Sequence, residues 1–234
     1  MSGADASQRI ARRRMQPALV FGALGAISGA VIVGLKVALD HAGLDLHKGL
    51  AVFGFDLSLD DLSLYPGLVF GIVIGVALLR RGLASAAQAA GYVVAAMLAN
   101  FAATNLAYTL YEGRHGLAIG LAAGALGAAS LTALTLAILP FSRRLRPCVL
   151  MVAAGTALGA LLSITLDLIE RDTVSAYLGL LVLYVPWQGA FAAAFGHSLD
   201  DPKIRADAVR TKLAERGAER DVADAVSWSR KERP

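Results

Sequence analysis

The chain has 234 residues, of which 56% are hydrophobic and 17% are charged, and its formal net charge is +4. Together with a mean hydropathy of +0.60, this composition excludes an ordinary soluble domain. The single cysteine, Cys148, excludes an intramolecular disulfide and a cysteine-based metal cluster. Long uncharged stretches alternate with short charged segments along the chain, which is the pattern of a helical membrane protein.

The apolar stretches predict about six transmembrane helices. Their expected bounds are 17–39, 66–80, 83–112, 117–139, 147–169 and 174–196. The stretch at 66–80 has about 14 apolar residues, or about 21 Å of helix, which is short for a hydrocarbon core of about 30 Å. We therefore expect an all-α integral membrane protein, in which residues 17–197 form a compact bundle of about six transmembrane helices.

Basic residues predict the orientation of this bundle, N-in/C-in. When both termini are cytoplasmic, most of the 22 Lys and Arg residues fall on the cytoplasmic side, and the exceptions are Lys36, Lys48, Arg114 and Arg171. We therefore expect a multi-pass protein of the cytoplasmic (inner) membrane, with a basic cytoplasmic N-terminus at 1–16. Residues 198–234 are expected to form a helical cytoplasmic tail, because Asp200-Asp201-Pro202 favours a helix start.

The segment 40–65 is expected to be a partly ordered outer loop, rich in aspartate. Residues 53–60 alternate between apolar and polar with a period of two, which favours a strand or a hairpin. Ser58 and Asp61 have the spacing of a capping box, which favours a short helix instead. Both interpretations of the loop stay open.

The helix expected at 83–112 carries a polar stripe. Asn100, Thr104 and Tyr108 recur every four residues and therefore share one face of the helix. Inside a membrane these amide and hydroxyl groups need partners or water. We expect the stripe to form one wall of an outward-facing cavity.

Polar side chains on other helices are expected at the same depth, in the outer half of the membrane. Ionisable groups inside a membrane are costly, so Lys36 and Asp167 are candidates for function, and we hypothesise that they pair across two helices. The last span adds an aromatic ring that can stack on a ligand, with an amide beside it. The predicted ligand-binding residues are Lys36, Asn100, Thr104, Tyr108, Asp167, Tyr184, Trp187 and Gln188.

Each of these residues also has a purely structural interpretation. Lys36 precedes an aspartate by four residues, and Asp167 lies among loop charges, so both can pair locally. Gln188 can bind a backbone carbonyl freed by Pro186, and Trp187 can pack beside the same kink. In this interpretation the polar groups form a hydrogen-bonded network that fixes the register of the helices.

The spans carry no catalytic, metal or cofactor motif, so we expect no enzymatic activity and no bound metal or cofactor. His41 and His47, in the acidic loop, match no metal-binding spacing. The basic residues resemble topology signals and contacts to anionic lipid, not a nucleic-acid surface. A membrane or cytoplasmic protein partner is expected at the C-terminal tail or at the small-residue stripe of the first span, which comprises Gly22, Gly25, Gly29 and Val33.

These observations favour a small-solute binding or transport protein, embedded in the lipid bilayer, whose polar pocket opens outward. The alternative is a structural or assembly subunit of a membrane complex with no ligand of its own. A membrane-embedded enzyme is a third class, and its candidate acids would be the loop aspartates. Convergence of the polar residues on one cavity distinguishes the first class from the second.

Overall fold

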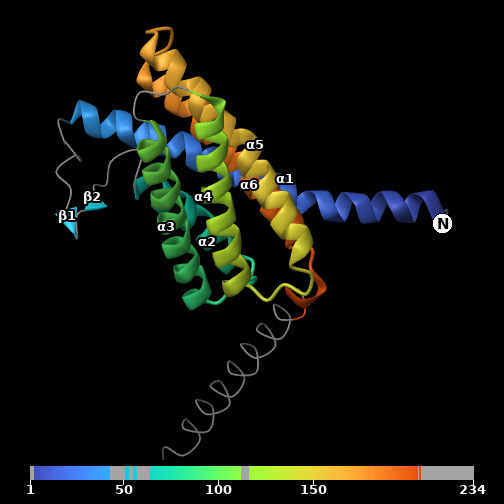
Figure 1. Ribbon diagram of the computed structural model, residues 1–234. Helices are drawn as coiled ribbons and strands as arrows, with labels where there is room; N and C mark the ends of the chain where they lie inside the picture. The colour runs from blue at the N-terminus through green and yellow to red at the C-terminus, as the bar shows by residue number, and fades with distance from the viewer. Residues whose placement is uncertain are drawn as a thin grey trace, which may run out of the picture.

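A computed structural model of the chain describes residues 3–42, 51–52, 55–56, 64–111, 116–204 and 206. These residues form a bundle of helices and one small hairpin (Figure 1). The helices are α1 (Gly3–His41), α2 (Tyr65–Arg80), α3 (Ala86–Tyr111), α4 (Leu117–Ile138), α5 (Leu145–Glu170) and α6 (Ala176–Ser198). Strands β1 (Ala51–Val52) and β2 (Phe55–Asp56) pair in antiparallel fashion, with Val52 opposite Phe55.

The helices define a multi-pass helical membrane protein, which confirms the predicted class of fold. Among the described residues, 5 helices are long and apolar enough to cross a membrane, and α2, with 16 residues, is shorter. The predicted spans at 66–80, 117–139 and 174–196 correspond closely to α2, α4 and α6. α1 begins earlier than the first predicted span, because residues 3–16 contain good helix formers and the helix continues through Pro17.

The outer loop and the tail are described only in part. The hairpin of β1 and β2 begins two residues before the alternating segment 53–60. The capping-box pair, Ser58 and Asp61, lies outside the described residues. In the tail, residues 202–204 and 206 are helical. The predicted tail helix otherwise falls outside the described residues.

The helices form a ring, in which each packs against the next and α6 packs against α1. Neighbouring helices run antiparallel, as in the pair of α1 and α6, where Asp40 meets Tyr177 and Pro17 meets Gly196. The ring therefore has two ends. The end at which α1, α3 and α5 finish is called the hairpin end. The opposite end is called the arginine end, after Arg80, Arg81, Arg143, Arg144 and Arg146.

The small-residue stripe of α1 faces α6 of the same chain. A Cβ added at Gly29 would lie 2.7 Å from the Tyr184 carbonyl oxygen, and one at Gly25 would meet the Gln188 carbonyl oxygen. Only glycine permits such close approach of two helix backbones. The stripe is covered within the chain, so it is not available to a protein partner, contrary to that expectation.

Aromatic side chains fill the ring toward the arginine end. The Phe21 ring meets the Phe195 ring edge-on with centroids 5.5 Å apart, and Tyr92 stacks on Phe195 at 5.7 Å. All three side chains are fully buried. One helical turn nearer the hairpin end, Phe191 meets Phe70 edge-on at 6.1 Å. These rings pack the interior of the ring on the arginine side.

Asp201 joins the tail to the link between α4 and α5 at the arginine end. Its Oδ2 accepts hydrogen bonds from Ser142 N (3.0 Å), Ser142 Oγ (2.7 Å) and Arg143 N (3.2 Å), and its Oδ1 accepts one from Lys203 N (2.9 Å). Burial raises the pKa of the Asp201 carboxyl, but hydrogen bonds from Ser142, Lys203 and Arg143 outweigh burial, so the pKa lies below its ordinary value. The ionised carboxylate of Asp201 therefore holds the start of the tail against the link between α4 and α5.

Candidate functional site

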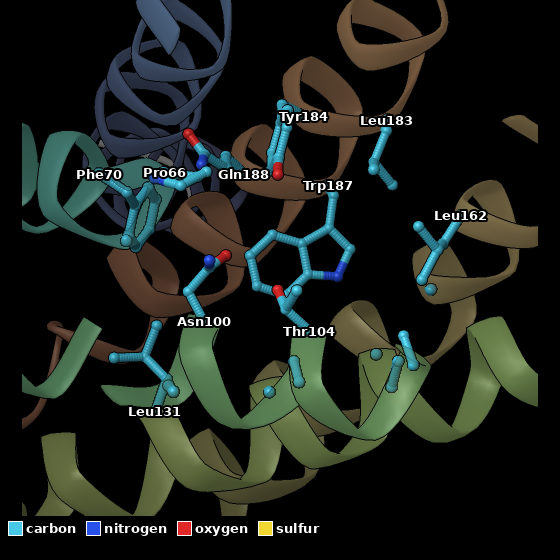
Figure 2. A pocket seen from close by; sticks show the side chains of 18 of the residues that line it. Pro66, Phe70, Asn100, Thr104, Leu131, Leu162, Leu183, Tyr184, Trp187 and Gln188 are labelled. Carbon is cyan, nitrogen blue, oxygen red and sulfur yellow. The ribbon is translucent and has the colours of Figure 1, made fainter. Parts of the chain in front are cut away.

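The interior of the ring holds a cavity of about 210 Å³. Helices α2 to α6 each contribute side chains to its wall (Figure 2). Most of the lining residues are apolar. The polar ones come from α3 and α6, and they are Asn100, Thr104, Tyr184, Trp187 and Gln188.

The cavity lies in the half of the ring that is nearer the hairpin end. Pro66 at the start of α2, Ala107 near the end of α3 and Leu166 near the end of α5 all line it. These three helix termini meet at the hairpin end. On the other side, Phe70 lines the cavity and contacts Phe191, so packed aromatic rings separate the cavity from the arginine end.

Helix α3 supplies the polar wall that its sequence pattern predicts. Asn100 and Thr104 lie one helical turn apart, line the cavity and point toward α6 in Figure 2. The neighbouring Asn105 turns back on its own helix, where its amide donates a hydrogen bond to the Phe101 carbonyl at 2.8 Å. The side chain of Tyr108 lies outside the described part of the structure, so its place in the wall stays a prediction.

Helix α6 supplies the aromatic wall. The Trp187 indole lies among the lining side chains in Figure 2, and its Nε1–H donates a hydrogen bond to the Gly155 carbonyl at 3.1 Å. The indole also stacks on Phe191, with ring centroids 5.7 Å apart and planes at 9°. Two contacts from two helices therefore hold the ring in one orientation.

Gln188 links the cavity wall to α1. Its Oε1 accepts a hydrogen bond from the Ser28 hydroxyl at 2.5 Å, and Ser28 Oγ also lies 2.8 Å from the Gly25 carbonyl oxygen. Both side chains are buried. The carboxamide is anchored through its oxygen, so the amide NH₂ group is the part that remains for the cavity.

The space itself exists because small residues face it from four helices. Larger side chains at these positions would fill the interior at the density usual for proteins. The small lining residues are Gly67, Ala96, Ala99, Ala103, Ala107, Ala123, Gly124, Gly127 and Gly159. The cavity therefore results from Ala and Gly residues that face one another on neighbouring helices.

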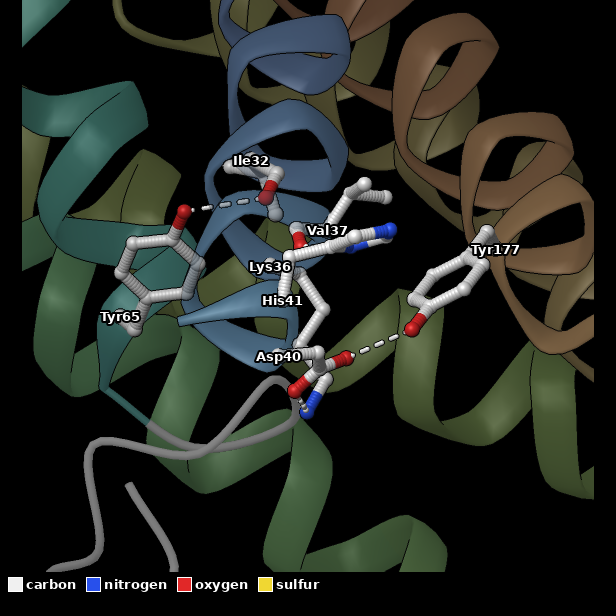
Figure 3. Close-up of polar contacts among 7 residues, drawn as sticks. All are labelled: Ile32, Lys36, Val37, Asp40, His41, Tyr65 and Tyr177. Carbon is white, nitrogen blue, oxygen red and sulfur yellow. Dashed lines mark hydrogen bonds and ion pairs between the residues drawn. The ribbon is translucent and has the colours of Figure 1, made fainter. Parts of the chain in front are cut away.

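Lys36 and Asp167 lie at the hairpin end but are not among the cavity-lining residues. Lys36 Nζ lies 2.9 Å from Asp40 Oδ1, and the Tyr177 hydroxyl donates to Asp40 Oδ2 at 2.9 Å (Figure 3). Asp167 Oδ1 lies 2.8 Å from Arg171 Nη2. The hypothesised pair of Lys36 with Asp167 is therefore wrong, because each residue has an opposite charge four positions away on its own helix.

The described residues that line the cavity include no Asp, Glu, Lys, Arg or His. Its chemistry is that of hydroxyl, amide and aromatic groups in an apolar wall. In the part of the chain that the structure describes, no group of three His, Cys, Asp or Glu residues lies close enough to hold a metal ion. The site can therefore bind by shape and hydrogen bonding, without a charge of its own.

Sequence reasoning missed the apolar part of the wall. Phe70, Leu131 and Leu162 line the cavity from α2, α4 and α5. In α4 a signal was available, because Gly124 and Gly127 lie on one small face. The large apolar residues carried no signal, since a leucine in a membrane span can face lipid or the interior.

The fold and the cavity together define the class: a multi-pass helical membrane protein with a cavity lined by its helices. Comparison of the chain with protein-family models, with curated proteins and with solved structures finds no match.

Proposed function

We propose that the protein binds a small solute in this cavity, either as a receptor or as part of a transport system. The observation that carries the proposal is convergence. Asn100 and Thr104 on α3 and Tyr184, Trp187 and Gln188 on α6 line one cavity, although α3 and α6 are far apart in the sequence. A pocket that is mostly apolar, with a few polar groups directed inward, is the usual form of a small-molecule site.

The proposed cavity opens toward the outside of an inner membrane. The arginines of the arginine end favour its placement in the cytoplasm, with both termini on that side. The cavity then lies in the outer half of the bilayer, and the packed rings of Phe21, Phe70, Tyr92, Phe191 and Phe195 lie below it. This arrangement supports entry of the solute from the outer side.

Binding is a better-supported activity than catalysis. The described lining contains hydroxyl and amide groups but no carboxylate, imidazole or amine that would serve as a general acid or base. We therefore propose a binding or transport protein and not an enzyme.

The proposal is tested by mass spectrometry of small molecules that copurify with the protein. Ala103 lines the cavity, so Ala103→Leu should fill it and remove the bound molecule. Ala90 lies on the exposed face of the same helix, so Ala90→Leu is the matched control and should retain it. Equal retention by the two variants, or no retained molecule in the wild-type protein, would count against a solute site.

The second candidate is a structural or assembly subunit without a ligand. It is supported by the internal bonding of polar groups: Trp187 binds the Gly155 carbonyl, and Ser163 Oγ accepts from Gly120 N at 3.0 Å and donates to the Gly116 carbonyl at 2.9 Å. In that case Ala103→Leu would leave the assembly of the chain into its complex unchanged. The amount of any copurified small molecule would also be the same in Ala103→Leu as in the wild-type protein.

A further inference from the structure

We infer that the ligand is an uncharged, flat aromatic molecule with one hydrogen-bonding edge. This inference rests on the proposed function, because it concerns the occupant of the same cavity. It follows from three properties of the wall: its lack of charge, the fixed indole of Trp187, and the placement of the amide and hydroxyl groups.

The first property excludes a charged ligand. The described lining residues carry no formal charge, and Lys36, Asp40 and Asp167, at the hairpin end, are held in ion pairs and are not among the lining residues. A carboxylate or ammonium group in this wall would lose its hydration without gaining a counter-charge. The cavity therefore selects against ions of either sign.

The second property favours a flat ring. One face of the Trp187 indole is covered by Phe191 in a nearly parallel stack, and its Nε1–H is fixed to the Gly155 carbonyl. Trp187 also lines the cavity, so part of its ring is presented to a ligand there. Small residues border the indole in the same wall: Ala103 and Gly127 line the cavity, and a Cβ added at Gly127 would lie 4.0 Å from Trp187 Cζ2. Aromatic rings prefer offset stacking on such a platform, whereas a puckered ring of the same size would not match it.

The third property places hydrogen-bonding groups at the border of that platform. Asn100 and Thr104 point toward the indole from α3 in Figure 2, and Gln188 lines the same cavity from α6. These amide and hydroxyl groups offer both donors and acceptors. A site built to hydrogen-bond its ligand strongly rejects analogues that lack the polar edge, so a lipid acyl chain is a poor occupant.

The test compares three probes by equilibrium dialysis against nanodiscs that contain the full chain, with empty nanodiscs as the correction for partitioning. The probes are 2-naphthamide (flat, neutral, with an amide edge), 2-naphthoate (the same rings with a negative charge) and decahydronaphthalene-2-carboxamide (the same amide on puckered rings). We expect 2-naphthamide to bind at least about ten-fold more tightly than either of the others. The wild-type protein and Ala90→Leu should show this binding, and Ala103→Leu should lose it.

Three results would overturn the inference. Equal or tighter binding of 2-naphthoate contradicts the selection against charge, and equal binding of the decahydro compound contradicts the flat stack. Absence of 2-naphthamide binding up to its solubility contradicts the ligand class as a whole. If no probe binds but Ala103→Leu still loses a copurified molecule, the inferred ligand class is wrong and the proposed function is supported. If Ala103→Leu changes neither probe binding nor the copurified molecule, both the ligand class and the proposed function are wrong.

Discussion

The indole nitrogen of Trp187 donates a hydrogen bond to the Gly155 carbonyl oxygen, 3.1 Å away. This contact joins α6 to α5 beside the cavity, and it occurs where α5 carries no side chain. The same glycine packs against Ala128 of α4. Gly155 therefore sets both the spacing of α4 and α5 and the position of the ring on which we propose that the ligand stacks.

Gly155→Ala should destabilise the protein. The added Cβ would overlap the Ala128 side chain, so α4 and α5 would have to move apart, at a cost of about 1–3 kcal/mol. The measurement is the thermal unfolding midpoint in detergent. Gly34→Ala is the matched control, because a Cβ at Gly34 meets nothing within 4 Å. An unchanged midpoint for Gly155→Ala would show that the close packing described here is not present.

Asn100→Leu should reduce ligand binding by at least about ten-fold while leaving membrane insertion intact, because it removes a polar group from the cavity wall. The amount of copurified small molecule per mole of protein measures the effect. Asn105→Leu is the control, since Asn105 bonds to its own helix at Phe101 and is not among the lining residues. Unchanged binding in Asn100→Leu would remove Asn100 from the site.

The proposed topology predicts the accessibility of two exposed positions. Thr173 lies at the hairpin end and Arg144 at the arginine end. In a Cys148→Ser background, Thr173→Cys should react with a membrane-impermeant thiol reagent in intact spheroplasts, and Arg144→Cys should react only after permeabilisation. The opposite pattern of labelling would invert the orientation, and the cavity would then open toward the cytoplasm.

The stability of the arginine end should depend on pH through Asp201. Because the pKa of the folded carboxyl lies below its unfolded value of about 3.9, the carboxylate stabilises the fold above that pH. This contribution is lost as the pH falls through the lower pKa of the folded state.

Asp201→Asn should therefore lower the unfolding temperature near neutral pH, and the difference from wild type should shrink in acid. The substitution removes the carboxylate from three partly buried backbone donors, at a cost of about 1 kcal/mol at neutral pH. Unfolding midpoints measured from neutral to acid pH check this. Asp172→Asn, at an exposed residue of the hairpin end, should show no such difference. A gap that is constant with pH would rule out the ionised carboxylate as its cause.

Hydropathy predicted most of the helices, because a transmembrane helix must be apolar along its whole length. The bounds that hydropathy predicted for α4 and α6 agree closely with the structure. The i, i+4 spacing of Asn100 and Thr104 predicted that they share a face of α3, and both line the cavity. Hydropathy did not predict the continuation of α1 to Gly3, since polar helix formers outside the membrane resemble a polar segment of any conformation.

The pairing of charges and the apolar wall could not be predicted from the sequence in this way. Lys36 is within reach of Asp40 along its own helix, and the choice between that partner and Asp167 depends on how helices pack. The stack of Trp187 on Phe191 likewise depends on side-chain rotamers as well as on spacing. The stripe of Gly22, Gly25 and Gly29 predicted a close helix contact correctly, but could not say that the partner is α6 of the same chain.

The central claim, that a solute binds beside Trp187, is tested most directly by the fluorescence of that residue. The chain has 2 tryptophans, so in Trp228→Phe the emission comes from Trp187 alone. Small molecules extracted from the purified wild-type protein are titrated into ligand-free Trp228→Phe. We predict a saturable change in emission that is absent when Ala103→Leu is added to the same variant. No change, or the same change in both variants, would contradict the claim.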